Sequence, residues 1–298
     1  MNKEEVRKLL KKLRKYEIAI RKAITTQMQG DFHSVFKGSG ITFDDVRPYQ
    51  YGDDIRSIDW NATAKGHSVY VKTYREEREQ IVYLVLDVSA SQEIGNQGHQ
   101  KVDVGKEICG VLALSAIKEG SQVGMFCFSD QKEVYVKPSK GDKHAYQIIS
   151  KLYNLRPSST RTDLNNAIRY LLNVIKRRSI VIFVSDFIDE GYDDNLRALA
   201  RKHDLIITHL SDRRETKLPS LGIVPVYDKE SRKTLWVNSS SSFFRNRISN
   251  TYGNTRQSLE EFCRKYQADY LPVNTDEDYV PKLIKLFRVR SRIRKSSW

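Results

Sequence analysis

Long apolar runs and cysteine motifs are both missing from this sequence. No stretch of the 298 residues approaches the roughly 20 apolar residues that a membrane-spanning helix needs. The first residues, MNKEEVRKLLKKLRKYE, are charged where a signal peptide carries its apolar segment. The three cysteines lie far apart, so they form no CxxC motif and are expected to be buried thiols. These absences predict a cytoplasmic protein with no membrane span.

Recognisable catalytic signatures are missing as well. The chain has no GxxxxGK[ST], no GxSxG and no HExxH, and its six histidines show no metal-ligand spacing. A Mg²⁺-dependent phosphohydrolase stays open as an alternative, because Asp87 follows a strand-like run. Ser89, however, stands where such an enzyme needs a second carboxylate. We therefore expect a protein that is not an enzyme.

Acidic residues are scarce at both ends of the chain. The formal net charge is +14, and the last 17 residues, KLIKLFRVRSRIRKSSW, include no acid. This excess predicts an anionic partner, which could be nucleic acid, a membrane surface or an acidic protein, although solvated helix faces explain it equally well. Because there is no nucleic-acid reading motif, nucleic-acid or anionic-surface binding through the basic ends is an alternative rather than the preferred function.

The two ends of the chain have helical patterns, and the segment after the first helix does not. Apolar residues spaced by three and four predict an amphipathic basic helix over 1–30, which could dock on its own domain or on another chain. Turn signals such as YGDD and AKGH predict a small β-rich segment over 31–78. A basic helix or tail is expected over 276–298.

Strands alternate with helical stretches in the central part of the chain. IVYLVL, at 81–86, is a continuous apolar run of the kind found in a parallel strand that is buried on both faces. The alternation predicts an α/β domain over 79–275 with three layers and a mostly parallel central sheet. The segment GIVPVYDKESRKTLWVN predicts a hairpin inserted at about 222–240.

Oxygen-bearing side chains follow the central strand at every second position. Asp87, Ser89 and Ser91 can present three oxygens to one point, because alternate side chains of an extended segment point the same way. Thr162, at the start of a predicted helix, and Asp186, at the end of another buried strand, occupy equivalent places. Ligands bind beyond the carboxyl ends of such strands, and Mg²⁺ prefers oxygen donors. The pattern predicts a Mg²⁺ or Mn²⁺ site, although each residue alone could also cap a helix or lie in a turn.

These motifs carry a resemblance to known families. DVSAS, TRTDL and VSDF are similar to the metal-ion-dependent adhesion site of von Willebrand factor type A domains, and its five positions match Asp87, Ser89, Ser91, Thr162 and Asp186. The preceding segment, FDDVRPYQYGDDIRSIDWNATAKGHSVYVKTYREERE, closely resembles the hallmark of a bacterial family called domain of unknown function 58. The resemblance implies a von Willebrand factor type A-like three-layer sandwich, with a small β-rich segment and a helix before it. The paired charges of the hallmark predict an ionic knot that clamps this segment against the metal domain, with a docking surface as the alternative.

The resemblance also implies a task. Members of this family usually sit beside MoxR-type AAA+ ATPases, which implies an adaptor role with such an ATPase. Hydroxyl ligands add no negative charge, so a cation held here stays electrophilic and can capture a carboxylate from another protein. We expect a metal-dependent protein-interaction module whose partner is a MoxR-type ATPase or its client. Some family members carry transmembrane helices near the N-terminus, and this feature is not carried over.

Overall fold

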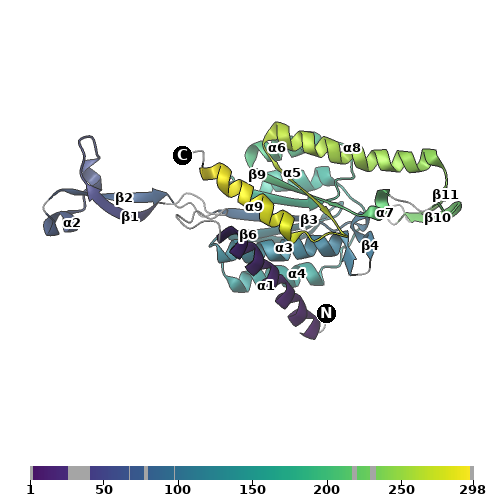
Figure 1. Cartoon of the computed structure of the whole chain (residues 1–298), viewed down its shortest axis with the longest axis horizontal. Helices are drawn as coiled ribbons and strands as arrows, with labels where there is room; N and C mark the ends of the chain where they lie inside the picture. The colour runs from purple at the N-terminus through teal and green to yellow at the C-terminus, as the bar shows by residue number, and fades with distance from the viewer. Residues whose placement is uncertain are drawn as a thin grey trace. The chain divides into compact units, whose positions relative to one another are not determined.

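The computed structural model divides the chain into two compact units. It describes residues 3–25, 41–66, 68–76, 80–96, 98–216, 220–228 and 233–295. The smaller unit is Phe36–Gln80, and the larger unit combines Met1–Val35 with Ile81–Trp298. Figure 1 shows the helices and strands of each unit. Among the helices of the described residues, none has both the length and the apolar character that crossing a membrane requires.

A six-stranded sheet forms the centre of the larger unit, in the order β12-β9-β8-β3-β6-β7. Its strands are β3 (Ile81–Asp87), β6 (Gln122–Phe128), β7 (Lys132–Ser139), β8 (Ile180–Ser185), β9 (Asp204–Ser211) and β12 (Asp269–Asn274). All neighbouring pairs are parallel except β6 and β7. The mostly parallel sheet predicted from the sequence is thus confirmed. Strands β3 and β8 are buried almost along their whole length and are apolar up to their last residues, Asp87 and Ser185, because helices cover both faces of the sheet.

Helices form a layer on each face of this sheet (Figure 1). On one face, α3 (Lys101–Lys118) packs against α4 (Asp142–Asn154) and α1 (Lys3–Thr25), and α1 also contacts α9 (Val280–Lys295). The other face is covered by α5 (Leu164–Val174), α6 (Asp193–Lys202) and α8 (Ser242–Tyr266), whose buried residues share one core with the sheet. The expected three-layer arrangement, with the sheet between two layers of helices, is confirmed.

Helix α3 lies unusually close to the sheet. A methyl group added at Gly105 would come within 2.7 Å of Leu86 Cδ1, so only glycine allows this approach without a shift of the leucine. The outer side of α3 is also covered, because α1 and α4 pack on it. The close contact fixes the first residue of α3, Lys101, next to the edge of the sheet where β3 ends.

Helix α1 docks on its own unit. Leu13 and Ile20 are buried, and Leu13 lies over α3, where a methyl group on Gly110 would come within 3.1 Å of it. Lys12 pairs with Glu107 of α3. Of the two docking modes that the amphipathic pattern left open, the structure shows the intramolecular one.

The smaller unit is built on an antiparallel pair, β1 (Ile41–Pro48) and β2 (Tyr70–Glu76), with a short 3-10 helix, Ile55–Ser57, and α2 (Trp60–Lys65). Asp59 caps α2 by accepting hydrogen bonds from the backbone of the first turn. Arg47 donates two hydrogen bonds, of 2.7 and 2.6 Å, to the carboxylate of Asp53. The described part of the predicted segment thus contains one antiparallel strand pair, and the Arg47–Asp53 pair is one contact of the ionic knot. The clamp against the larger unit stays a prediction.

The remaining elements of the larger unit are short. They are the 3-10 helix Ala90–Glu93, the strand pair β4 (Gly95–Asn96) and β5 (His99–Gln100), the helix α7 (Arg213–Thr216) and the antiparallel hairpin of β10 (Ile223–Asp228) and β11 (Lys233–Asn238). Helix α7 follows directly on β9, so it lies at the carboxyl edge of the sheet, as do β4 and the 3-10 helix that follow β3.

Candidate metal centre

The predicted ligands lie at the carboxyl edge of the central sheet. Asp87 ends β3, and Asp186 directly follows β8, the parallel neighbour of β3. After β3, the chain adds β6 and β7 on one side of β3 in the sheet. It then adds β8, β9 and β12 on the other side, so the direction in which strands are added reverses between β3 and β8. Such a switch point opens a crevice at the carboxyl ends of the strands, where open α/β sheets bind ligands.

The side chains of Asp87, Ser89 and Ser91 come together where extended backbone passes into a 3-10 helix. The strand ends at Asp87, and Ser89 is already the N-cap of the 3-10 helix Ala90–Glu93. Asp87 Oδ1 accepts hydrogen bonds from Ser89 N at 3.0 Å and from Ser89 Oγ at 2.7 Å. The two serine hydroxyl oxygens are 3.1 Å apart. The extended geometry assumed from the sequence therefore holds as far as Ser89 and ends at the 3-10 helix that carries Ser91.

The other carboxylate oxygen of Asp87 contacts two residues that the sequence analysis missed. Asp87 Oδ2 accepts a hydrogen bond from Ser185 Oγ at 2.7 Å and from Gln92 Nε2 at 3.3 Å. Gln92 Nε2 also lies 3.2 Å from Ser91 Oγ. Ser185 directly precedes Asp186 in the VSDF motif, and that position next to a predicted ligand is the signal that would have pointed to it.

Burial makes Asp87 difficult to ionise. Its side chain is inaccessible to solvent. Burial and the negative charge of Asp186 together raise the pKa of Asp87 to about 7, although the hydrogen bonds from Ser89 and Ser185 lower it. A cation bound next to this carboxylate would therefore relieve an electrostatic cost.

Asp186 belongs to a buried ion-pair network. Lys101 Nζ donates to Asp186 Oδ2 at 2.7 Å and also to Glu215 Oε1, and all three side chains are at most 1% exposed. Burial lowers the pKa of Lys101, but the two carboxylates raise it by more, so this lysine keeps its charge. No sequence spacing indicates this network, because Lys101 is 85 residues from Asp186 and 114 residues from Glu215.

Thr162 lies in the loop before α5, and this loop packs against the turn that holds the serines. Ala90 N donates a hydrogen bond of 3.0 Å to Thr160 O. The N-cap of α5 is Asp163, which accepts from Asn166 N at 2.7 Å. Helix capping was the simple alternative for Thr162, but Asp163 is the residue that caps α5. Thr162 stays a predicted ligand.

The donor set fits a hard cation. It offers the Asp87 carboxylate and the Ser89 and Ser91 hydroxyls, and the buried Gln92 Oε1 next to them has no hydrogen-bond partner. Mg²⁺ takes oxygen donors of this kind and needs only one or two carboxylates. Within the described ranges, no three His, Cys, Asp or Glu side chains form a group that could hold a metal ion. The candidate set combines carboxylates with neutral oxygens instead.

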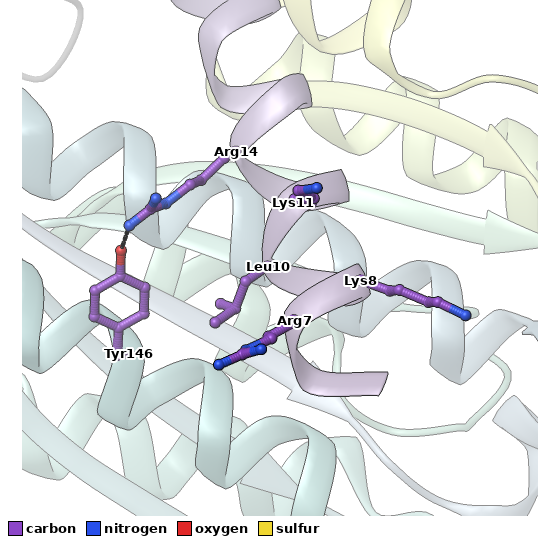
Figure 2. A pocket seen from close by; sticks show the side chains of 6 residues that line it. All are labelled: Arg7, Lys8, Leu10, Lys11, Arg14 and Tyr146. Carbon is purple, nitrogen blue, oxygen red and sulfur yellow. Dashed lines mark hydrogen bonds between the residues drawn. The ribbon is translucent and has the colours of Figure 1, made fainter. Parts of the chain in front are cut away.

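A basic pocket lies on the α1 side of the larger unit, apart from this centre. Its volume is about 710 Å³, and it is lined by Arg7, Lys8, Leu10, Lys11, Arg14 and Tyr146. Figure 2 shows that Arg14 reaches the hydroxyl of Tyr146, whereas Lys8 extends away from that residue. The cations therefore do not converge on one point, and anion binding through the basic ends stays an alternative.

We expect Lys101→Met to lower the free energy of unfolding by about 3–5 kcal/mol, because it leaves two carboxylates buried without a counter-charge. The matched control is Lys118→Met, which removes a lysine from an exposed pair with Asp142 whose side chains are 44% and 56% exposed. This change should cost about 1 kcal/mol or less. Urea denaturation followed by circular dichroism measures both. Equal stability of Lys101→Met and the parent protein would show that the network is not charged as described.

Mg²⁺ at tenfold excess over its dissociation constant should add about 1.4 kcal/mol to the free energy of unfolding and raise Tm by a few degrees. Asp87→Asn should abolish this shift, whereas Asp194→Asn, at an 88% exposed side chain, should keep it. Because the pKa of Asp87 is about 7, protons compete with the ion below that pH. Mg²⁺ affinity should thus rise as the pH is raised to about 7 and then level off. An unchanged Mg²⁺ response in Asp87→Asn would place the ion elsewhere.

The chain is similar to several known proteins. It is 26% identical over 288 residues to "Uncharacterized protein Rv1480" of Mycobacterium tuberculosis (strain ATCC 25618 / H37Rv), which covers 96% of this chain and 90% of that protein. Among solved structures, it is similar to the conserved hypothetical protein BatB from Bacteroides thetaiotaomicron, with 13% identity and a TM-score of 0.43 over 73% of this chain and 100% of that chain. It is also similar to proximal thread matrix protein 1 from the mussel byssus with a zinc occupied MIDAS motif, with 15% identity and a TM-score of 0.40 over 72% of this chain and 48% of that chain.

A family model covers most of the chain. The model described as "Protein of unknown function DUF58" matches residues 45–258, a range that includes most of the charged hallmark and the sheet edge with Asp87 and Asp186. The family expected from the hallmark is thereby confirmed, and the chain belongs to the DUF58 family.

Proposed function

We propose that this protein is a non-enzymatic, divalent-metal-dependent protein-interaction module. The observation that carries the proposal is the buried carboxylate of Asp87 with the hydroxyls of Ser89 and Ser91 at the carboxyl edge of the sheet. A Mg²⁺ or Mn²⁺ ion held by these oxygens would supply an open coordination position to a carboxylate from another protein. The hydroxyls add no charge, so the incoming carboxylate forms a charge-assisted contact that water does not match.

The charges around the site support a divalent ion. Asp87, Asp186 and Glu215 contribute three negative charges when ionised, and Lys101 contributes one positive charge, which leaves two negative charges in a buried cluster. A divalent cation neutralises this remainder. Because Lys101 already pairs with Asp186, Asp87 is the carboxylate that faces the ion.

The partner that we propose is a MoxR-type AAA+ ATPase or its client, with this protein as an adaptor in protein assembly or maturation. The chain belongs to the DUF58 family, and the choice of partner follows what the family resemblance of the sequence implies. The net charge of +14 would further speed the encounter with an acidic partner. This long-range attraction weakens with salt, whereas the contact at the metal is short-range and weakens less.

We further propose that the protein has no turnover of its own. A metal-dependent hydrolase needs an acid or base next to its ion. At this site Lys101 engages both Asp186 and Glu215, and the position two residues after Asp87 is Ser89. The phosphohydrolase alternative therefore lacks its second working carboxylate.

We expect the purified protein to bind the MoxR-type ATPase of its own organism in Mg²⁺ and to lose this binding in EDTA. Ser89→Ala, which removes a predicted ligand, should weaken the binding about tenfold or more. Ser150→Ala, an exposed serine on α4, is the matched control and should bind as the parent does. Optical biosensing measures how tightly the parent protein, Ser89→Ala and Ser150→Ala each bind to the surface-immobilised ATPase.

Binding that survives both EDTA and Ser89→Ala would remove the metal from the mechanism. DNA and anionic vesicles, tested across a salt series, provide the counter-experiment for the basic pocket. Tight binding of either at physiological salt, lost in Lys11→Glu, would assign the function to the basic surface instead.

The isolated protein should hydrolyse no phosphoester, nucleotide or peptide above background in Mg²⁺, because the site lacks an acid–base pair. The assay compares the parent protein with Asp87→Asn from parallel preparations, so that a contaminating hydrolase gives the same rate in both. Hydrolysis by the parent that disappears in Asp87→Asn would establish the phosphohydrolase alternative.

A further inference from the structure

The loop that carries Thr162 has no helix or strand of its own. It runs over residues 155–163, between the end of α4 at Asn154 and the start of α5 at Leu164. A segment of this kind costs conformational entropy to order, so contacts with neighbouring elements must hold it in one arrangement. Those contacts therefore decide where Thr162 lies with respect to Asp87 and the two serines.

Glu133 of β7 holds the first half of this loop. Its Oε2 accepts hydrogen bonds from Ser158 N at 3.0 Å and from Ser158 Oγ at 2.7 Å. Its Oε1 accepts from Ser159 N at 3.2 Å and from Ser129 Oγ, in the turn between β6 and β7, at 2.7 Å. Burial raises the pKa of Glu133, but these hydrogen bonds lower it by more, so the side chain is charged near neutral pH. The carboxylate thus ties the backbone of the loop to β7.

Glu133 lies in a β-bulge. In the pairing of β6 with β7, Phe128 lies opposite Lys132, and its neighbour Cys127 lies opposite Val134. Glu133 is therefore an extra residue of β7 between these two pairs. Bulges of this kind redirect a side chain and are common next to functional sites. We attribute the direction of the Glu133 side chain, toward the loop between α4 and α5, to this bulge.

The same loop contacts the serines of the candidate metal centre. Ala90, which lies between the two serines, donates a hydrogen bond of 3.0 Å from its backbone N to Thr160 O. Thr160 directly follows the two residues that Glu133 holds, and Thr162 is two positions further on. Hydrogen bonds and a short piece of backbone therefore connect Glu133 to the serine turn and to Thr162.

We propose that Glu133 is a positioning residue that sets the Mg²⁺ or Mn²⁺ affinity of the candidate centre through Thr162. This inference rests on the proposed function, because it takes over the metal centre of that function. By holding the loop in one arrangement, Glu133 keeps it packed against the serine turn. A site that is only partly populated in its binding-competent form binds its ligand more weakly in the same proportion. Residues that orient a metal ligand from outside commonly change metal affinity by about 10- to 100-fold.

The test is a double-mutant cycle of Glu133→Gln and Thr162→Ala. Electron paramagnetic resonance, which detects free Mn²⁺, measures the Mn²⁺ dissociation constant of each protein. In Glu133→Gln an NH₂ group stands where a carboxylate oxygen accepted hydrogen bonds, so the loop loses part of its anchor. Each single variant should bind Mn²⁺ about tenfold or more weakly than the parent. The double variant should bind about as weakly as Thr162→Ala alone, because Glu133 acts through that residue.

A control variant and a second measurement separate positioning from a general loss of structure. The control is Glu260→Gln, which changes a glutamate of α8 that pairs with Arg256 and is 34% exposed, and it should bind Mn²⁺ as the parent does. In Glu133→Gln, hydrogen exchange should become faster at the amides of Ser158 and Ser159 and stay unchanged in β3. Equally faster exchange in the loop and in β3 would assign Glu133 to overall stability and overturn the positioning role.

The Mn²⁺ measurements also distinguish the role of Glu133 from the metal centre itself. Parent-like affinity in Glu133→Gln, or losses in the two single variants that add up in the double variant, would overturn the positioning role and leave the metal centre intact. Parent-like affinity in Thr162→Ala would remove Thr162 from the ligand set and overturn the positioning role with it. A parent protein that binds no Mn²⁺ would contradict both the metal centre and the role of Glu133.

Discussion

The buried contact of Lys101 with Asp186 and Glu215 organises the functional edge of this protein. It joins the start of α3, the end of β8 and α7, which are far apart in sequence. Its charges lie in a region of low dielectric, where removing one partner leaves the others uncompensated. The close approach of α3 to the sheet at Gly105 places the lysine where this contact can form. Among the predicted metal ligands, Asp186 is held directly by this contact.

The ion-pair network also sets the electrostatics of the candidate metal centre. Asp186 pairs with the lysine, while Asp87 receives only neutral hydrogen bonds, and its burial together with the charge of Asp186 raises its pKa to about 7. Near neutral pH, Asp87 can therefore carry either a proton or, with a bound cation, its full charge. Such a site suits reversible metal binding that an incoming carboxylate completes.

The sequence predicted the parts of the structure that depend on local pattern. Continuous apolar runs identified β3 and β8, and the oxygen-bearing residues after them located the candidate centre. Contacts between distant segments were not accessible in this way. The pairing of Lys101 with Glu215 depends on how α3 and α7 pack, and Asp163 rather than Thr162 caps α5 because of the local backbone geometry. The hairpin was predicted, but the exposure of Trp236 follows from tertiary packing alone.

Anomalous diffraction from crystals grown in saturating Mn²⁺ tests the central claim most directly. The account predicts one strong manganese peak within coordination distance of the Asp87 carboxylate and the hydroxyls of Ser89 and Ser91, with Lys101 still bonded to Asp186. A peak at another site, or no peak at the carboxyl edge of β3 while the ion is saturating, would contradict the metal-dependent account.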